Sequence, residues 1–363
     1  MGCSTLLLER QCIGIEKLTT ADITIHGAGV FGLSIGYVCA RRGAKVRVID
    51  PYGVGAGASG GIVGALAPHT PENWNPKKAF QFESLTMAAD FWGDVENTAD
   101  LRTGYGQTGR LQPIADDRAM GLANRRAVTG DDLWQGLAKW EIIKATGSDW
   151  EPATQSGYLI HDTLSARIHP MNTCMALAKA INKLGGEVTI ESHPDQGQIV
   201  WANGYQGLLD LSDRFAKRVG NGVKGQAALF KFSALGLPQL FADALHIVPH
   251  SDGTVAVGST SEREFDEPTK PDGLLDDVVA RARAAFPVLA DLTVIQRWAG
   301  VRPRAKSRAP MLGSYPERTG HFIANGGFKI GFGMAPKIAH VMADVILDGR
   351  DEIPEGFRVE DSF

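Results

Sequence analysis

The chain of 363 residues has an ordinary globular composition, with 44% hydrophobic residues, 21% charged residues and a formal net charge of −4. This length predicts about two domains and a core large enough to need neither disulfides nor metals. The pI near 6.2 argues against non-specific nucleic-acid binding, and no run of about 18 apolar residues predicts a membrane span.

Residues 1–21 are expected to form an N-terminal extension before the first strand. Their apolar run of three leucines is too short for the core of a signal peptide. The chain has four cysteines, Cys3, Cys12, Cys39 and Cys174, and none forms a Cys-x-x-Cys pair. This usage predicts no metal or dithiol site and favours a reducing, cytoplasmic location.

The first regular elements form a βαβ unit. Residues 22–26 are rich in β-branched side chains, residues 30–42 have helical periodicity, and Gly43 supplies a stop signal. Residues 45–50 then form a second strand that ends in Asp50. The order and the lengths are those of a parallel strand pair joined by a crossover helix.

The loop inside this unit, Gly27-Ala28-Gly29-Val30-Phe31-Gly32, matches the G-x-G-x-x-G fingerprint. Gly27 permits the tight turn, Gly29 lets a pyrophosphate approach the backbone, and Gly32 lets helix and strand pack closely. The helix N-terminus offers free N–H groups to phosphates, and Asp50, 18 residues after Gly32, can accept hydrogen bonds from ribose hydroxyls. The pattern predicts a dinucleotide site but does not separate NAD from FAD.

The rest of the chain alternates helical and strand patterns without an internal repeat, beginning with a small-residue segment at 53–66. We expect helices at residues 79–92, 131–146, 170–184 and 274–286, and a last helix from Pro336 to about residue 348. We expect strands at residues 109–115, 188–190, 198–202, 254–259, 294–302 and 321–325. Because strand–glycine–helix units both open and close the chain, we expect a discontinuous cofactor domain with a second domain inserted.

Four segments resemble the D-amino-acid oxidase and glycine oxidase family. Residues 55–71, GAGASGGIVGALAPHTP, resemble its second flavin-contact segment, and residues 248–262 resemble a strand pair of its substrate domain. Residues 297–313, RWAGVRPRAKSRAPMLG, are similar to its tryptophan–glycine–arginine–proline strand, and residues 322–349 to its closing flavin motif. With gaps, the resemblance runs in the right order from about residue 22 to residue 349.

The resemblance implies an α/β fold with a Rossmann-like FAD-binding domain of the glutathione-reductase type. An antiparallel-sheet substrate domain of the α+β type is inserted into it. The FAD domain would comprise residues 22–85, 150–215 and 298–350, and the substrate domain residues 86–149 and 216–297.

The resemblance also implies non-covalent FAD. No cysteine follows Cys174 to form a cysteinyl–flavin bond, and we do not expect a histidyl bond from His69. The helix after the closing motif would direct its N-terminus at the flavin edge that becomes negative on reduction. The implied cofactor contacts are Gly27, Gly29, Val30, Phe31, Gly32, Asp50, Pro51, Ala58, Ser59, Val63, Gly64, Ala65, Gly327, Phe328, Lys329, Ile330, Gly331, Phe332 and Gly333.

Arg302 matches the arginine with which the family grips a substrate carboxylate. A guanidinium binds a carboxylate bidentately and keeps its charge, so it can hold the substrate α-carbon over the flavin. The implied reaction moves a hydride from the α-carbon of a small amine or amino acid to flavin N5. The imine product then hydrolyses, and O2 or another acceptor reoxidises the flavin.

The sequence departs from the family pattern in four places. Lys329 stands where arginine is frequent, and His246 stands where a tyrosine often flanks the substrate; both are candidate catalytic residues. The stretch 188–201 is short, so the adenine end is expected to be bound differently. The basic run Arg304, Lys306 and Arg308 is a solvated face or recognises a second anionic group of the substrate.

Three other functions stay open from the sequence. Residues 57–66 also resemble a flavin enzyme that modifies a tRNA wobble uridine, although the acidic pI weighs against RNA binding. A non-catalytic NAD-binding regulator would use the same glycine-rich loop, and a 2-hydroxy acid would use Arg302 equally well. The sequence decides neither the substrate and its stereochemistry nor the electron acceptor or oligomeric state.

Overall fold

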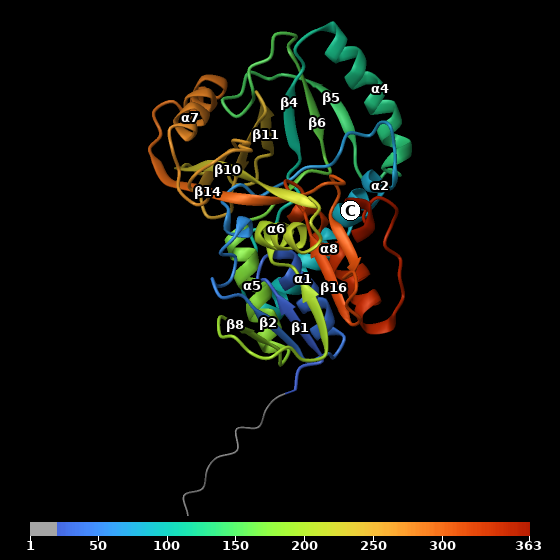
Figure 1. Ribbon diagram of the computed structural model, residues 1–363. Coiled ribbons are helices and arrows are strands. Elements are labelled where there is room, and N and C mark those ends of the chain that lie inside the picture. Colours follow the sequence, from blue (N-terminus) through green and yellow to red (C-terminus); the bar gives the residue numbers. More distant parts are fainter. Residues whose placement is uncertain (1–19) are drawn as a thin grey trace, which may run out of the picture.

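The glycine-rich βαβ unit lies in the middle of a six-stranded sheet (Figure 1). The computed structural model describes residues 20–363, so most of the expected extension, with Cys3 and Cys12, lies outside the described residues. The strand order is β15-β16-β9-β1-β2-β8, and all neighbours are parallel except β15, which is antiparallel to β16. These strands are β1 (Ile23–His26), β2 (Val46–Ile49), β8 (Glu187–Thr189), β9 (Gln198–Trp201), β15 (Met311–Ser314) and β16 (His321–Asn325).

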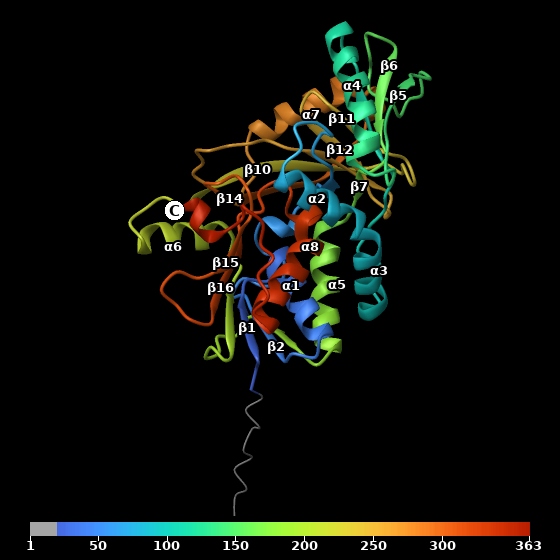
Figure 2. The same ribbon diagram turned by 90° about the vertical axis from the view of Figure 1, so that its right-hand side faces the viewer.

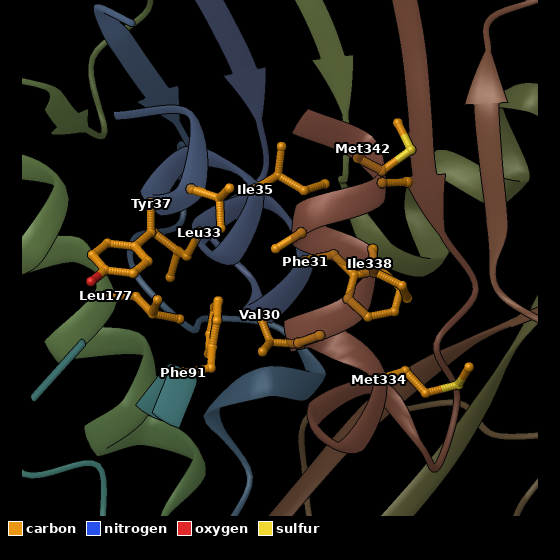
Figure 3. Close-up of a cluster of buried hydrophobic side chains, with 14 of the residues drawn as sticks. Val30, Phe31, Leu33, Ile35, Tyr37, Phe91, Leu177, Met334, Ile338 and Met342 are labelled. Atoms are coloured by element: carbon orange, nitrogen blue, oxygen red, sulfur yellow. The ribbon is translucent and has the colours of Figure 1, made fainter. Parts of the chain in front are cut away.

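Three helices pack side by side on one face of this sheet (Figure 2). They are α1 (Val30–Arg41), α5 (Pro170–Lys183) and α8 (Gly331–Ala343), with α2 (Pro76–Thr86) against α8 and α3 (Ala88–Ala99) against α5. α1 is buried along almost its whole length, because it lies between the sheet and both neighbouring helices. Figure 3 shows Val30 and Phe31 of α1 beside Met334 and Ile338 of α8, so the first turns of these two helices lie close together.

A single short loop covers part of the opposite face of the sheet. The Thr24 hydroxyl on β1 donates to the Gln196 carbonyl at 2.9 Å, and the Gln196 N–H donates back to it at 3.0 Å. Residues 190–197 therefore stand where the resemblance implies a longer meander of strands. Whether the adenine end is bound differently stays a prediction.

The second large sheet has eight strands in the order β14-β10-β13-β12-β11-β4-β6-β5, and its pairs are antiparallel except β11 with β4. β10 and β14 are its longest strands and pair from Gly220 opposite Ala305 to Phe230 opposite Val294. The strands are β4 (Arg110–Pro113), β5 (Trp140–Lys144), β6 (Tyr158–Asp162), β10 (Gly220–Lys231), β11 (Gln239–Ala242), β12 (Leu245–Pro249), β13 (Thr254–Gly258) and β14 (Val294–Ala305).

Three helices accompany this sheet: α4 (Asp117–Leu133) packs on β5, α7 (Leu274–Ala285) packs on β10 and β13, and α6 (Gly204–Arg214) packs on β10 and β14. β3 (Ala65–Leu66) and β7 (Ala166–Arg167) pair with each other as a third, two-stranded sheet. None of the helices in residues 20–363 is long and apolar enough to cross a bilayer. A parallel Rossmann-like sheet joined to a mainly antiparallel sheet confirms the expected fold class.

Three expected helices differ from the structure. The expected helix at residues 131–146 is wrong, because α4 ends at Leu133 and residues 140–144 form β5. Gln135 and Gly136 adopt positive φ values of 52° and 72°, which end the helix, and the isoleucines of β5 then pair with β6. The expected helix at residues 79–92 is two helices, α2 and α3, that meet at Met87.

The last helix begins at Gly331 and not at Pro336. Phe328 at φ 45° completes the turn before it, and a proline in the second helical turn removes only one backbone hydrogen bond. The sequence also missed β10, β11 and α6. The expected domain boundaries stay a prediction; strand pairing places β6 in the eight-stranded sheet, although the boundary at residue 150 assigned it to the cofactor part.

Candidate active site

A cavity of about 1050 Å³ lies between the two large sheets. The residues that follow β1, β2, β9 and β16 line it on one side, and residues 298–303 of β14 line it on the other. β1 is a topological switch point, because it pairs with β2 on one side and with β9 on the other. Ligands of open α/β sheets bind at the carboxyl ends of strands at such a point.

Almost every expected site residue lines this cavity. Arg302, Lys329 and His246 do, and so does every expected cofactor contact except Gly32. A Cβ on Gly32 would lie 2.0 Å from the Gly27 carbonyl oxygen, so this glycine serves the packing of α1 on its strand, as its position in the fingerprint predicts. That the other residues contact a cofactor stays a prediction.

The glycine-rich loop is held tightly against neighbouring backbone. Gly27 has φ +113°, and a Cβ there would lie 2.4 Å from the Ala202 carbonyl oxygen after β9. The Asp50 carboxylate accepts the Ala28 N–H at 2.9 Å and the Tyr52 N–H at 3.0 Å. The start of α1 is thereby fixed at the carboxyl edge of the sheet, with an acidic group next to it.

The small-residue segment packs under the same loop. The Ser59 hydroxyl accepts the Val30 N–H at 3.0 Å, in a short 3-10 helix formed by Ala58–Gly60. A Cβ on Gly64 would lie 1.6 Å from the Ile168 carbonyl oxygen, so only glycine fits there. The Trp298 ring on β14 closes the other side of this segment, 3.4 Å from a Cβ built on Gly61.

The loop between β16 and α8, residues 326–330, is called the closing loop, and it brings a second helix start to the cavity. A Cβ on Gly327 would lie 2.7 Å from the Phe31 ring, so this loop and the glycine-rich loop touch. The Phe328 N–H donates to the Pro303 carbonyl at 2.9 Å, which ties the closing loop to the end of β14. Within residues 20–363, the N-cap residues Gly29 of α1 and Ile330 of α8 make no side-chain capping bond, and at α1 only the Val30 N–H is taken, by the Ser59 hydroxyl. Two helix starts therefore present N–H groups and positive dipole ends to one cavity.

Arg302 projects from β14 into the cavity without an acidic partner. Its Nη2 donates to the Ser259 hydroxyl at 2.6 Å, and both terminal nitrogens approach the Thr260 carbonyl at 3.4 Å. The guanidinium lies against Gly225 of β10, where a Cβ would be 1.7 Å from Nη2. Burial lowers the pKa of Arg302 to about 10, which leaves it charged at neutral pH. The charge of Glu262 opposes this lowering, but no carboxylate in residues 20–363 forms an ion pair with Arg302, so its guanidinium can still bind an anion in the cavity.

A hydrogen-bonded network fixes Thr260, which together with the neighbouring Ser259 contacts the Arg302 guanidinium. The Thr260 hydroxyl accepts the Gln226 N–H at 2.8 Å and contacts the Glu262 carboxylate. The Gln226 amide donates to Glu262 at 3.0 Å and to Asp272 at 2.7 Å. Buried Lys224 forms an ion pair with Asp272 at 2.7 Å. Lys224, Gln226 and Asp272 lie outside every helix, strand and motif that the sequence patterns pointed to, because they come from β10 and from the stretch before α7.

His246 lies on β12 and is neutral in this site. Burial, with the nearby charges of Arg110 and Lys329, lowers its pKa to about 3. Its ring lies 4.7 Å from that of Phe241, and its buried Nδ1 has no hydrogen-bond partner among the described residues. A neutral imidazole with one unused nitrogen can accept or donate one hydrogen bond to a bound substrate.

Several cavity residues were missed by sequence reasoning. Trp201 stacks on His26 with ring centroids 4.4 Å apart, and both line the cavity beyond the glycine-rich loop. The Asn203-Gly204 pair that follows β9 was the sequence feature that could have placed this edge of the sheet at the cavity. His69, which the sequence places just past the second flavin-contact segment, also lines the cavity; it bonds to the Gln81 side chain, and burial lowers its pKa.

Together the fold and this geometry define a dinucleotide-binding oxidoreductase, with an anion-binding wall facing the cofactor edge of a parallel sheet. Comparison with known proteins specifies the family. The model of the DAO family, the FAD dependent oxidoreductases, matches residues 22–345, and the chain belongs to this family. The expected resemblance and the choice of FAD over NAD are therefore confirmed.

The most similar relatives include glycine oxidases. The chain is 26% identical to glycine oxidase from Bacillus licheniformis, over 93% of this chain and 97% of the relative. The crystal structure of glycine oxidase from Geobacillus kaustophilus superposes with a TM-score of 0.79 at 20% identity, covering 93% of this chain and 98% of that one. Iminodiacetate oxidase from Chelativorans sp. BNC1 gives a TM-score of 0.77 at 20% identity, with the same coverage.

The residues present fit FAD. A Cβ on Gly57 would meet no atom within 4 Å, and one on Gly29 would meet only Ser59, so both glycine backbones can be approached from the cavity. The two helix starts, whose N-cap residues make no side-chain capping bond, suit a pyrophosphate at α1 and a negative ring edge at α8. The cavity volume is at the upper end of the range of about 300–1,000 Å³ for ligand sites, as a large cofactor and a small substrate together require.

Proposed function

We propose that the enzyme oxidises the carbon–nitrogen bond of a small amine or amino acid. The observation that supports this most directly is Arg302, a half-buried guanidinium on the cavity wall that forms no ion pair with a carboxylate of residues 20–363. Such a group is stable when a ligand supplies the anion. An α-carboxylate on Arg302 would place the neighbouring carbon and its amino group toward the closing loop and the cofactor.

The side chains of the site would orient the substrate and exclude water. Arg302, fixed by Ser259 and Gly225, would hold the carboxylate in one plane, and neutral His246 would share one hydrogen bond with the substrate. FAD, when bound, supplies the acceptor for the hydride of the α-carbon at its N5 atom. The first turn of α8 would stabilise negative charge at the end of the cavity that faces it.

The carboxylate nearest in effect to Arg302, that of Glu262, opposes through its charge the burial that lowers the pKa of the guanidinium, but it does not line the cavity, so it is not placed to act as a general base. Asp50 is the only acidic residue among the described lining residues, and it accepts two N–H groups in the glycine-rich loop. The amine would therefore react in its neutral form, after losing its proton to solvent. The imine product would leave and hydrolyse to an oxo acid or aldehyde and an amine or ammonia.

Two kinds of comparison support this proposal. The relative named glycine oxidase from Bacillus licheniformis matches 93% of the chain, and a structural neighbour is named iminodiacetate oxidase. Each of these substrates joins a carboxylate to an amine through one carbon. The electron acceptor, O2 or another compound, is left to experiment.

The test is the visible spectrum of the purified holoenzyme, recorded anaerobically while amino acids, N-methyl amino acids and 2-hydroxy acids are added. We expect at least one amine to bleach the flavin band near stoichiometry. Bleaching by 2-hydroxy acids alone would reassign the reaction. A flavin that no compound bleaches would contradict the proposal and return attention to a tRNA substrate.

A further inference from the structure

The cavity holds more positive charge than one carboxylate can neutralise. Lys329 lines the cavity with Arg302 but comes from the closing loop before α8, a different element. Arg304, two residues beyond Arg302, has its guanidinium carbon 5.3 Å from the centroid of the Phe328 ring. The Lys329 ammonium lies 5.8 Å from the same centroid. Phe328 itself lines the cavity, so these two cations flank one ring at its wall.

None of the three cations forms an ion pair within residues 20–363. Burial, and then the charges of Arg302 and Arg304, lower the pKa of Lys329. Neighbouring cations without an acidic partner disfavour each other's charged forms. A ligand anion at this place would relieve that repulsion.

Arg302 and Lys329 differ in how they can bind an anion, because the Arg302 side chain is fixed in place and Lys329 has a flexible side chain. The Arg302 fork is held from behind by Ser259, Thr260 and the flat surface at Gly225, so it presents one planar edge, and one carboxylate fills that edge. Lys329 is a point charge on a flexible stem with three donors. His246, whose pKa is lowered by burial and then by the charges of Arg110 and Lys329, lines the same cavity as Lys329.

We propose that the physiological substrate carries a second carboxylate, which Lys329 binds while Arg302 binds the first and Arg304 adds positive potential behind Phe328. The substrate class is then an amino- or iminodicarboxylate. This inference rests on the proposed oxidation of a carbon–nitrogen bond. The exposed Lys306 and Arg308 of the same basic run do not line the cavity and take no part.

The test uses substrate pairs that differ by one carboxylate: N-methylglycine with N-carboxymethylglycine, and alanine with aspartate in both enantiomers. We expect kcat/KM of the holoenzyme to favour the dicarboxylate of at least one pair by roughly tenfold to a hundredfold, the value of one charge-assisted hydrogen bond. Lys329→Met should remove that preference, and Lys329→Arg should retain it within a few-fold. Lys306→Gln, which removes a nearby exposed charge, should leave the ratio unchanged.

A binding measurement supplies a readout independent of turnover. Malonate and acetate contain no amine to be oxidised, and each should perturb the flavin spectrum on binding. Malonate should bind at least about tenfold more tightly than acetate to the wild type, and with equal affinity to Lys329→Met. The Lys329→Met protein is usable if it retains its full flavin absorbance.

The outcomes separate the two proposals. If monocarboxylates bleach the flavin and neither pair prefers its dicarboxylate, the proposed function stands and this inference is wrong. If Lys329→Met lowers kcat/KM equally for both substrates of a pair, Lys329 helps to bind the same carboxylate as Arg302, and the second subsite is refuted. If Lys306→Gln loses as much of the dicarboxylate preference as Lys329→Met does, the preference comes from the overall positive potential of the protein, and the Lys329 subsite is also refuted. If no amine bleaches the flavin, the proposed function fails, and the malonate–acetate ratio alone decides whether the subsite exists.

Discussion

The two walls of the cavity are built in different ways. The wall at β1 and α1 consists of backbone: glycines at 27 and 29, the start of a helix, and an acid at residue 50 that accepts backbone N–H groups. The wall at β14 and β12 consists of side chains, Arg302 and His246, whose neighbours come from β10 and from the segment after β13. A backbone wall depends on local conformation, whereas a side-chain wall depends on how distant strands pair.

This difference separates what each wall can recognise. Backbone N–H groups at helix starts bind phosphates of many ligands, so the cofactor wall is general. Arg302, together with Lys329 from the loop before α8, would instead respond to the number and placement of anionic groups, so the side-chain wall would select the substrate. Damage to the first wall should therefore remove flavin and stability, and damage to the second should remove turnover while flavin stays bound.

The largest effect is expected at Arg302. Arg302→Lys replaces a fixed fork by a point charge, so kcat/KM for amino acids should fall roughly 10²- to 10³-fold, about 3–4 kcal/mol. Flavin content should not change. Arg297→Lys, on the same strand but exposed and paired with Asp276, is the matched control. Steady-state kinetics measure both, and an unchanged kcat/KM in Arg302→Lys would contradict the role of Arg302 as carboxylate clamp.

The backbone wall should respond to a single methyl group. In Gly27→Ala the new Cβ overlaps the Ala202 carbonyl, and φ is +113°, so the protein should lose at least about 2 kcal/mol of stability. The melting temperature should fall by roughly 3 °C or more, with less bound FAD per chain. Gly93→Ala in α3, where a Cβ would meet nothing within 4 Å, should instead stabilise slightly. Equal melting temperatures for the two variants would show that the loop tolerates a side chain.

The smallest effect concerns pH. The native pKa values of His246 and His250, about 3 and about 4, lie below the value near 6.5 of an unfolded chain, because both rings are buried. Protons therefore bind the unfolded state first. The stability from each neutral ring is fully present above pH 6.5 and is lost on acidification, by about 1.4 kcal/mol per pH unit between pH 6.5 and the native pKa.

His246→Phe tests this assignment. Denaturant unfolding with saturating FAD at pH 8 and pH 5 should show a smaller acid loss in the variant than in the wild type, by about 2 kcal/mol. The His246 ring packs against Phe241, so a phenyl ring should fill the same space. Identical losses in the two proteins would mean that native His246 accepts a proton above pH 5.

Short stretches of sequence predicted the first βαβ unit correctly. The glycine-rich loop, its helix and Asp50 lie where the spacing predicts them, because each needs only its neighbours in sequence. The expected helix at residues 131–146 failed because the isoleucines of β5 suit a helix and a strand alike, and only pairing with β6 decides. β10 was missed because its glycines at 220, 222 and 225 weaken the strand pattern; Gly225 is there to make room for Arg302.

By itself, the sequence determined the parallel unit that opens the protein, its dinucleotide loop and the presence of an arginine on a late strand. These depend on backbone conformation and on the order of residues along a short stretch. Only the tertiary structure decided what Arg302 contacts, that Lys329 and Arg304 flank Phe328, and that His246 is neutral. Those properties depend on burial and on charges from distant elements, which strand pairing between β10, β12 and β14 brings to one wall.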